Sequence, residues 1–420
     1  MFKPCNQCSQ MFAPSTHQQL CASCAQSLTN IEKINPLKGS ALFEQEKFGD
    51  DNFMSSPPRN TEPSAPIKLL VGLIGINSVE HFEKSSIHKP ALELLTEALQ
   101  SLQAQFSESD IPSHQNWQGI LLAPEFFFHR SEKATPKSTH VKRLQIDSSR
   151  LPHRCLSEEE HAKLIEECKQ LSQKHPSTLI VPGSFLYRKK LNTKRKEKAT
   201  KTINDVNNKL RLKNVWTIDS KDDSKHFIGH STTGEIVGEF VKVDGSFKRD
   251  SIEQTLQKIQ DYDYMLRNVA YGFYNGRIVF KYHKVGLNAD IDSLDDNRTR
   301  TVFVSGGGPR DIVFNGVRIG LEICLDHDLG LLKHLQPDLK FDIHLIISGS
   351  VDNISDHFRH TSNGYVIHAD SEEEPSGVFN GNHESMTHKS VIGLKTKVAQ
   401  NRKTLTSYII QLTPATGQKN

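Results

Sequence analysis

The sequence lacks any apolar run of the roughly 20 residues that cross a bilayer, and its N-terminus lacks the apolar stretch of a signal peptide. It also lacks a dominant charge, since 52 Lys and Arg stand against 49 Asp and Glu, a formal net charge of +3. We therefore expect neither membrane association nor an obligate nucleic-acid partner. These absences predict a cytoplasmic protein, and export by a route other than Sec stays open.

Cysteine is scarce and unevenly placed. Four of the seven cysteines fall in residues 1–30, namely Cys5, Cys8, Cys21 and Cys24. They form two Cys-x2-Cys pairs separated by twelve residues, a spacing that lets two tight turns close a tetrahedral thiolate site around structural Zn²⁺. Disulfides are the alternative, but nothing else in the sequence indicates an oxidising compartment.

A segment of this length cannot build a core, so the zinc ion would supply its folding energy. It is similar to small zinc ribbons in general, which bind nucleic acid, proteins or nothing beyond their own chain. A macromolecular partner of this segment is therefore one possibility among these.

Composition divides the remaining chain into a linker and a large domain. Residues 31–66 include the Pro- and Ser-rich stretch SSPPRNTEPSAP, which is typical of an extended linker. From residue 67 to about 415, apolar strands first alternate with amphipathic helices, as in IKLLVGLIGI (67–76) and ALELLTEALQSLQAQ (91–105), and hairpins follow. This order predicts one α/β domain.

A basic insertion interrupts that domain at about 188–250. Residues 188–213 hold eleven Lys and Arg against only Glu197 and Asp205. Such a run could be a basic flap that recruits an anionic substrate or partner. We favour the simpler interpretation of a solvated mobile loop, because the run lacks the interleaved aromatics of a single-strand nucleic-acid platform.

The most informative segment is FNGVRIGLEICLDHDLG (314–330). Asn315-Gly316 between apolar runs is a strong hairpin signal, and Cys324 stands where the second run ends. A thiol at a strand end is held rigidly and can face a pocket, which suits a nucleophile. An isolated Cys on an apolar strand is also commonly a small core residue.

Two more segments place polar groups at strand ends. In WQGILLAPEFFFHR (117–130), Glu125 follows an apolar strand and precedes three phenylalanines, which is suited to a general base, although a Glu that turns outward to solvent is the alternative. In NGRIVFKYHKVGL (275–287), a second Asn-Gly turn precedes a strand that ends at Lys284. This lysine could donate to an oxyanion, although most lysines at strand ends are only solvated.

In the order Glu, Lys, Cys, the motifs APEF, KYHKVGL and GVRIGLEICLD resemble those of the nitrilase superfamily of carbon–nitrogen hydrolases. The resemblance covers roughly residues 67 to 370, and the segment around the Cys is its most specific part. The sequence departs from the family in its long segment between Glu125 and Lys284 and in LGLLKH (329–334), where the family has Pro-Glu and Arg. The family's second glutamate also has no clean match; the region offers only Asp290, Asp292, Asp295 and Asp296.

The resemblance implies a helix–sheet–sheet–helix (αββα) sandwich, preceded here by the zinc segment. It implies that Glu125 is the base, that Cys324 is the nucleophile, and that Lys284 and the backbone N–H of Leu325 stabilise the oxyanion. The substrate would be a small amide, a carbamoyl compound or an amidated chain end, with amides favoured over nitriles. No cofactor is expected for catalysis, and a homo-oligomer is expected by analogy. Asp326 is expected to fix the turn after Cys324.

Two other classes of function stay open. A catalytically silent nitrilase-like body could carry a zinc ribbon that recognises a macromolecule. Alternatively, a different thiol enzyme could use His327 or His283 as the base for Cys324.

Overall fold

The computed structural model of the chain describes residues 66–76, 88–113, 115–128, 155–212, 215–219, 225–230, 236–241, 252–285, 300–304, 306, 311–328, 330–349, 351–371, 375–395 and 404–413, together with 3–4 and 11–12. Cys5, Cys8, Cys21 and Cys24, like the linker 31–65, lie outside the described residues. Apart from two-residue strands β1 (Lys3–Pro4) and β2 (Met11–Phe12), the elements belong to one compact unit, Met54–Asn420. No helix among the described residues is long and apolar enough to cross a membrane.

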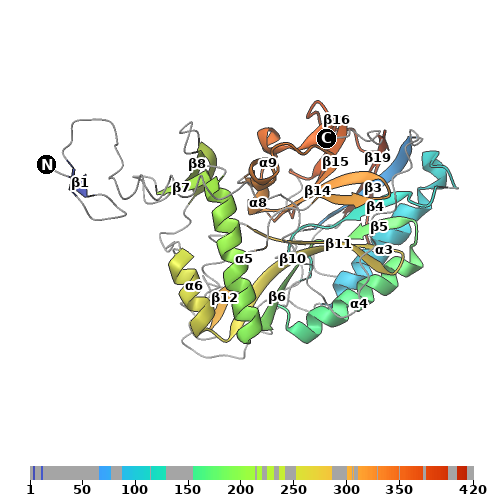
Figure 1. The fold of residues 1–420 in the computed structure, drawn as a ribbon. Coiled ribbons are helices and arrows are strands. Elements are labelled where there is room, and N and C mark those ends of the chain that lie inside the picture. Colours follow the sequence, from blue (N-terminus) through green and yellow to red (C-terminus); the bar gives the residue numbers. More distant parts are fainter. Residues whose placement is uncertain are drawn as a thin grey trace, which may run out of the picture. The chain divides into compact units, whose positions relative to one another are not determined.

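Two β-sheets form the centre of this unit (Figure 1). The first has nine strands, ordered β11-β10-β5-β4-β3-β19-β18, with β6 and β12 also pairing with β10. Its strands are β3 (Ile67–Gly75), β4 (Gly119–Leu122), β5 (Thr178–Val181), β6 (Ser184–Lys190), β10 (Tyr264–Tyr274), β11 (Arg277–His283), β12 (Thr301–Phe303), β18 (Ser390–Gly393) and β19 (Thr404–Leu412).

The second sheet has five strands in the order β13-β14-β15-β16-β17. Strands β14, β15 and β16 are parallel, and an antiparallel strand closes each edge. Its strands are β13 (Ile312–Phe314), β14 (Val317–Ile323), β15 (Phe341–Ile347), β16 (His360–Ala369) and β17 (Gly377–Phe379).

Both predicted hairpins are confirmed. β10 and β11 pair through Tyr274 and Arg277, and β13 and β14 pair through Phe314 and Val317. The Asn and Gly of each turn have positive φ, as the tightest hairpins require.

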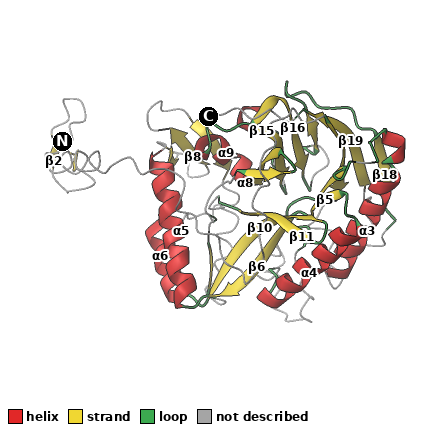
Figure 2. Cartoon of the chain, turned by 45° about the vertical axis from the view of Figure 1, so that its right-hand side comes forward, coloured by secondary structure: helices red, strands yellow, loops and turns green. Residues whose placement is uncertain are grey.

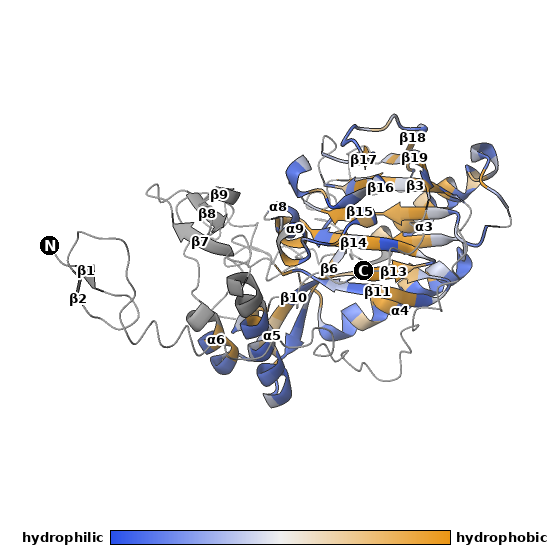
Figure 3. Ribbon diagram, turned by 45° about the horizontal axis from the view of Figure 1, so that its top comes forward, coloured by the Kyte–Doolittle hydropathy of each residue, from blue (hydrophilic) through white to orange (hydrophobic). Residues whose placement is uncertain are grey.

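The two sheets pack face to face through alternate side chains of their strands. Leu69, Val71 and Leu73 of β3 meet a cluster that includes Leu321 and Leu345 of the second sheet. Figure 3 shows strands β14 and β15 of the second sheet as mainly apolar. On its other side, the nine-stranded sheet is covered by α3 (His88–Ala104) and α4 (Glu158–Lys174) (Figure 2). The α/β class and the helix–sheet–sheet order are thus present.

Helix α4 begins where the sequence gives it a cap. The Ser157 hydroxyl accepts the Glu160 N–H at 3.1 Å, and the Glu160 carboxylate accepts the Ser157 N–H at 2.7 Å. This reciprocal pair and the acidic first turn stabilise the helix start.

The outer face of the five-stranded sheet differs from the expected second helical layer. Within the described residues, the helices on it are the short α8 (Leu325–Asp328) and α9 (Leu331–Leu335), where Leu332 packs over Gly320. The 3₁₀ turn η5 (Ser355–His357) follows β15, and η1 (Ser107–Ser109) follows α3. This face carries buried polar side chains, including Glu322, His344 and His368, instead of an apolar stripe for a long helix.

The loop expected in the basic insertion is wrong for its first part, which forms the twenty-residue helix α5 (Thr193–Leu212). Its buried Ala199 and Ile203 pack in a cluster with Ile259 of helix α6 (Ile252–Asp261). Many lysines surround Ala199 and Ile203 in the sequence, so the apolar face of the helix is hard to recognise there. The described part of α5 is mainly hydrophilic in Figure 3. A three-stranded sheet, β7 (Val215–Asp219), β8 (Lys225–His230) and β9 (Ile236–Val241), lies between the two helices in the chain.

Candidate active site

Three strand ends bring the predicted side chains together. Glu125 follows β4, Lys284 follows β11 of the same sheet, and Cys324 follows β14 of the opposite sheet. The side chains of Glu125 and Lys284 are at most 1% exposed, whereas Cys324 is partly exposed. The sequence left open that Glu125 turns outward to solvent and that Lys284 is only solvated. The burial of both side chains excludes these two alternatives.

Glu125 and Lys284 form a buried ion pair. The Lys284 ammonium lies 2.9 Å from Glu125 Oε1. Burial opposes the charge of Lys284, but the acidic groups around it, Cys324 and Glu125 foremost, raise its pKa above the usual value. Lys284 is therefore a cation at neutral pH.

Cys324 is directed at this pair by its backbone. Its φ is +50°, a left-handed conformation that costs a non-glycine residue on the order of 1 kcal/mol. The backbone N–H of Cys324 donates to Ile347 O at 2.8 Å, and its carbonyl accepts the His327 N–H at 2.8 Å. Strand β14 and the turn of α8 thus hold a strained residue in one orientation.

The thiol of Cys324 lies beside the Glu125 carboxylate and the backbone of Gly349. Burial, followed by the negative charge of Glu125, raises the pKa of the thiol, and Lys284 offsets only part of this. At neutral pH the resting group is therefore a neutral thiol beside a carboxylate.

Asn268 is a neighbour of the carboxylate that our reading of the sequence missed. Its Nδ2 donates to Glu125 Oε1 at 2.7 Å, and its backbone carbonyl accepts the Lys284 N–H at 2.9 Å. Asn268 is 1% exposed and lies in the middle of β10, which is buried along nearly its whole length. The sequence signal that could have identified Asn268 is a polar residue at the start of the otherwise mainly apolar run NVAYGFY (268–274).

Asp326 fixes the strand end beside Lys284, and not only its own turn. Its carboxylate accepts the Tyr282 hydroxyl at 2.7 Å and the Val285 N–H at 3.1 Å, so it binds the residues on both sides of the lysine segment. The residues offered for a second glutamate, Asp290, Asp292, Asp295 and Asp296, lie outside the described part of the chain.

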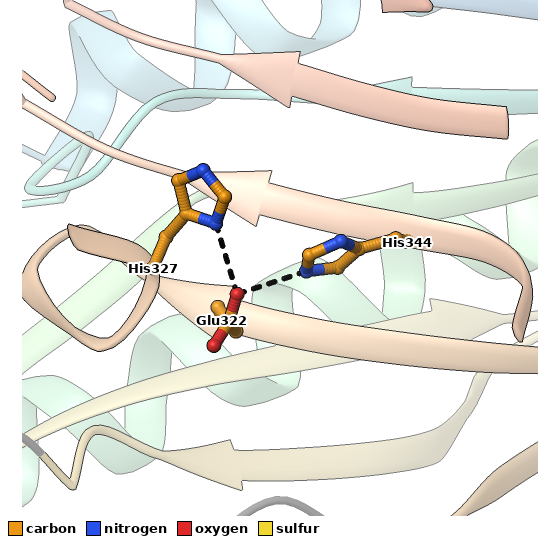
Figure 4. A group of neighbouring side chains, drawn as sticks. All are labelled: Glu322, His327 and His344. Atoms are coloured by element: carbon orange, nitrogen blue, oxygen red, sulfur yellow. Dashed lines mark hydrogen bonds and ion pairs between the residues drawn. The ribbon is translucent and has the colours of Figure 1, made fainter. Parts of the chain in front are cut away.

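Close to Cys324 in the chain, Glu322, His327 and His344 form a buried cluster (Figure 4). Glu322 Oε2 lies 3.0 Å from His327 Nδ1 and from His344 Nε2, and its Oε1 accepts the Leu332 N–H at 2.7 Å. Burial would raise the pKa of Glu322, but the hydrogen bonds from the two histidines lower it to about 2.

These residue types also bind metals, and their ligand atoms lie within 4.8 Å of one another. However, His344 Nδ1 accepts the Arg359 N–H at 3.3 Å, so the proton of a neutral His344 is on Nε2, where a metal would need a lone pair. We therefore interpret the cluster as a hydrogen-bonded support of the turn after Cys324. The groups that act on the Cys324 thiol are Glu125, Lys284 and the backbone of Gly349, and His327 is not among them, so the arrangement gives no support to His327 as the base for the thiol.

No family model and no curated protein matches this sequence. Among solved structures, the chain is similar to a mutant of an amidase from Nesterenkonia AN1, described as belonging to the nitrilase superfamily. The match has 11% identity and a TM-score of 0.39 and covers 83% of this chain and 92% of that chain. It is also similar to Saccharomyces cerevisiae Nit3, a member of branch 10 of the nitrilase superfamily, with 13% identity and a TM-score of 0.37 over 83% and 91%.

Proposed function

We propose that the protein is a cysteine-dependent carbon–nitrogen hydrolase of nitrilase type that cleaves a non-peptide amide bond. The observation that carries this proposal is the contact of the Cys324 thiol with a buried carboxylate that is itself paired with Lys284. A nucleophile, a base and a cation within one buried group match what acyl transfer needs.

Proton transfer begins the reaction. Glu125 removes the S–H proton as the sulfur attacks the amide carbon, and the C=O electrons move to the oxygen. The raised pKa of the thiol means that this transfer accompanies attack, since little free thiolate exists beforehand.

The oxyanion is stabilised by Lys284 and the backbone N–H of Leu325. An ammonium carries three N–H groups, and Glu125 Oε1 takes one of them. Lys284 can therefore serve the carboxylate and the oxyanion at the same time. A single donor of this kind is typically worth about 3–4 kcal/mol of barrier.

Breakdown of the intermediate returns the proton. Glu125 protonates the leaving amine as the C–N bond breaks, which leaves a thioester on Cys324. Glu125 then takes a proton from water, the hydroxide attacks the thioester, and cleavage of the C–S bond releases the carboxylic acid and restores the thiol. Within this chemistry we favour amides over nitriles by analogy with the resembled superfamily.

The test is a panel of small primary amides, carbamoyl compounds, amidated peptides and nitriles incubated with the full-length protein, with ammonia release and protein mass as readouts. Turnover with an acyl adduct on Cys324, both abolished in Cys324→Ala, supports the proposal. If Cys324 of the parent protein is no more reactive than the buried Cys155 and Cys168, the catalytically silent alternative is favoured.

We also propose that Cys5, Cys8, Cys21 and Cys24 hold one structural Zn²⁺. The proposal rests on their spacing in the sequence and on the metal preference of thiolate sets. The zinc ion would take no part in amide hydrolysis, and the segment could serve a macromolecular partner.

A further inference from the structure

Three consecutive backbone positions at the end of β15, residues 347–349, hold the proposed nucleophile and base together. Ile347 O accepts the Cys324 N–H at 2.8 Å, and Ser348 O accepts the Glu125 N–H at 3.1 Å. The backbone of Gly349 lies beside the Cys324 thiol. Because Glu125 and Cys324 come from different sheets, residues 347–349 are a shared support, and a shift there changes the distance between thiol and carboxylate.

The side chain at the centre of this support is tied to a buried polar network. The Ser348 hydroxyl is hydrogen-bonded to His368 Nε2 and to Asp370 Oδ2. Asp370 Oδ2 also accepts the Val351 N–H at 3.1 Å. Asn353 Oδ1 lies 2.6 Å from His368 Nδ1, and its Nδ2 donates to Pro375 O at 2.7 Å. The network thus joins β15, β16 and the loop that follows β15.

The hydrogen count fixes how these groups bind. Since Asn353 Nδ2 donates to Pro375, its Oδ1 faces His368, and His368 Nδ1 must carry a proton. Ser348 has a single proton for two partners, so one further proton must lie between His368 Nε2 and Asp370. His368 and Asp370 therefore act as a neutral pair bridged by Ser348, which a buried site tolerates far better than a lone charge.

Ser348, His368 and Asp370 do not form a second nucleophilic site. Ser348 and His368 are fully buried and Asp370 is 1% exposed, so no substrate reaches the hydroxyl. The orienting partner of His368 Nδ1 is an amide, and the carboxylate lies on the serine side of the ring, 3.7 Å from Nε2.

We propose that Ser348, His368 and Asp370 are positioning residues that fix backbone 347–349 and thereby hold the Cys324 thiol against the Glu125 carboxylate. This inference rests on the proposed function, and it adds a support for catalysis that lies entirely in the second sheet. Loss of the Ser348 hydroxyl keeps the side chains of Cys324 and Glu125 unchanged. It loosens backbone 347–349, to which both residues are hydrogen-bonded.

The test is the rate at which iodoacetamide modifies Cys324 in the zinc-loaded full-length protein, mapped by mass spectrometry across pH 6 to 10. Ser348→Ala is expected to slow modification at neutral pH by about tenfold, because Glu125 no longer assists the thiol. Asn353→Ala alters only the half-buried outer end of the network. It replaces Ser348→Ala as the test variant if Ser348→Ala does not fold. We expect Asn353→Ala to slow the labelling of Cys324 by threefold or more.

The matched control is Asp342→Asn. Asp342 is a buried carboxylate in the same strand that accepts a backbone N–H, from Arg318 at 2.8 Å, but it lies at the opposite end of β15. It should lower the melting temperature without slowing labelling. Unchanged labelling in both network variants, or equal slowing in the control, overturns the inference. Slow labelling of Cys324 in the parent protein overturns the proposed function as well, so the two failures are distinguishable.

Discussion

The ammonium of Lys284 lies 2.9 Å from Glu125 Oε1, and neither side chain is more than 1% exposed. Each charge in this pair makes the burial of the other tolerable, since removing one partner of a buried pair typically costs about 3–5 kcal/mol. The proposed base and the proposed oxyanion donor are therefore coupled in stability as well as in the proposed chemistry.

Lys284→Met should destabilise the protein strongly and reduce amide turnover by about 10²–10³-fold, because a buried carboxylate loses its cation and the oxyanion loses a donor. The double variant Lys284→Met/Glu125→Gln should recover much of the melting temperature but none of the turnover. Thermal unfolding followed by ammonia release checks both statements. Equal melting temperatures of the single and double variants would show that the pair is not coupled.

Glu125→Gln should separate thiol acidity from catalysis. Removing the carboxylate takes away a charge that raises the pKa of Cys324 and leaves Lys284, which lowers it, so the thiol should titrate at lower pH than in the parent protein. Labelling near neutral pH should still be slower than in the parent protein, because the carboxylate no longer takes the thiol proton as the sulfur attacks. Turnover should nevertheless fall by at least about 10²-fold, because the base is gone. The pH dependence of iodoacetamide labelling and an amide assay measure the two effects. Retained turnover would favour a histidine base instead.

Cys324→Gly should be more stable than Cys324→Ala by about 1 kcal/mol. At φ +50° a β-carbon is strained, and glycine removes that strain although it adds entropy to the unfolded chain. Denaturant unfolding of the two variants gives the difference. Greater stability of the alanine variant would mean that the strand end carries no strain.

His161 should make the protein sensitive to acid. Burial, with added repulsion from Lys281 and Lys189, lowers the pKa of His161 to about 3, while the unfolded residue titrates near 6.5. Between these values the unfolded state binds more protons, so stability falls as pH decreases below about 6.5. At about pH 4 the loss from this residue is roughly 3 kcal/mol.

His161→Phe preserves the stacking on Tyr187, where the ring centroids are 3.9 Å apart, and removes the titrating group. At neutral pH the free energy of unfolding of His161→Phe should be close to that of the parent protein. Near about pH 4 it should exceed that of the parent protein. His388→Gln, at an exposed histidine, is the control and should leave the acid profile unchanged. A parent-like profile for His161→Phe would contradict the assignment.

The full-length protein should contain about one zinc ion per chain. Elemental analysis measures it, and Cys5→Ser combined with Cys24→Ser should abolish it without changing amide turnover, because the zinc site is expected to be structural. Metal content unaffected by these substitutions would place the metal elsewhere or favour disulfides at the N-terminus.

Short-range sequence patterns predicted many of the helices, strands and turns correctly. They could not predict the contacts between elements that are far apart in the sequence. The apolar run of β3, the capping acids of α4 and both Asn-Gly turns are short-range signals, and each led to the observed element. Helix α5 was missed because, in the part of it whose side chains the structure describes, Ala199 and Ile203 mark the buried face among many lysines. Tertiary packing against α6, which no local pattern contains, overrides the charge of that segment.

The candidate site divides in the same way. Glu125, Lys284 and Cys324 stood out because each is a reactive group at the end of an apolar strand. Asn268 precedes an apolar run and Ser348 follows one, and their partners are far away in the sequence, such as Glu125, 143 residues from Asn268. A single sequence shows that such residues are polar in an apolar setting, but their partners depend on register and sheet packing.

The pairing of β3 with β19 bears on how the protein is made. Strand β19 pairs with β3 along its whole length, from Leu412 with Ile67 to Thr404 with Gly75. During synthesis β3 leaves the ribosome before β19, so the backbone N–H and C=O groups on that edge of β3 stay unpaired until residues 404–412 have followed. Open edges of this kind recruit other strands, so nascent chains should need chaperone protection, and products that stop before residue 404 should aggregate.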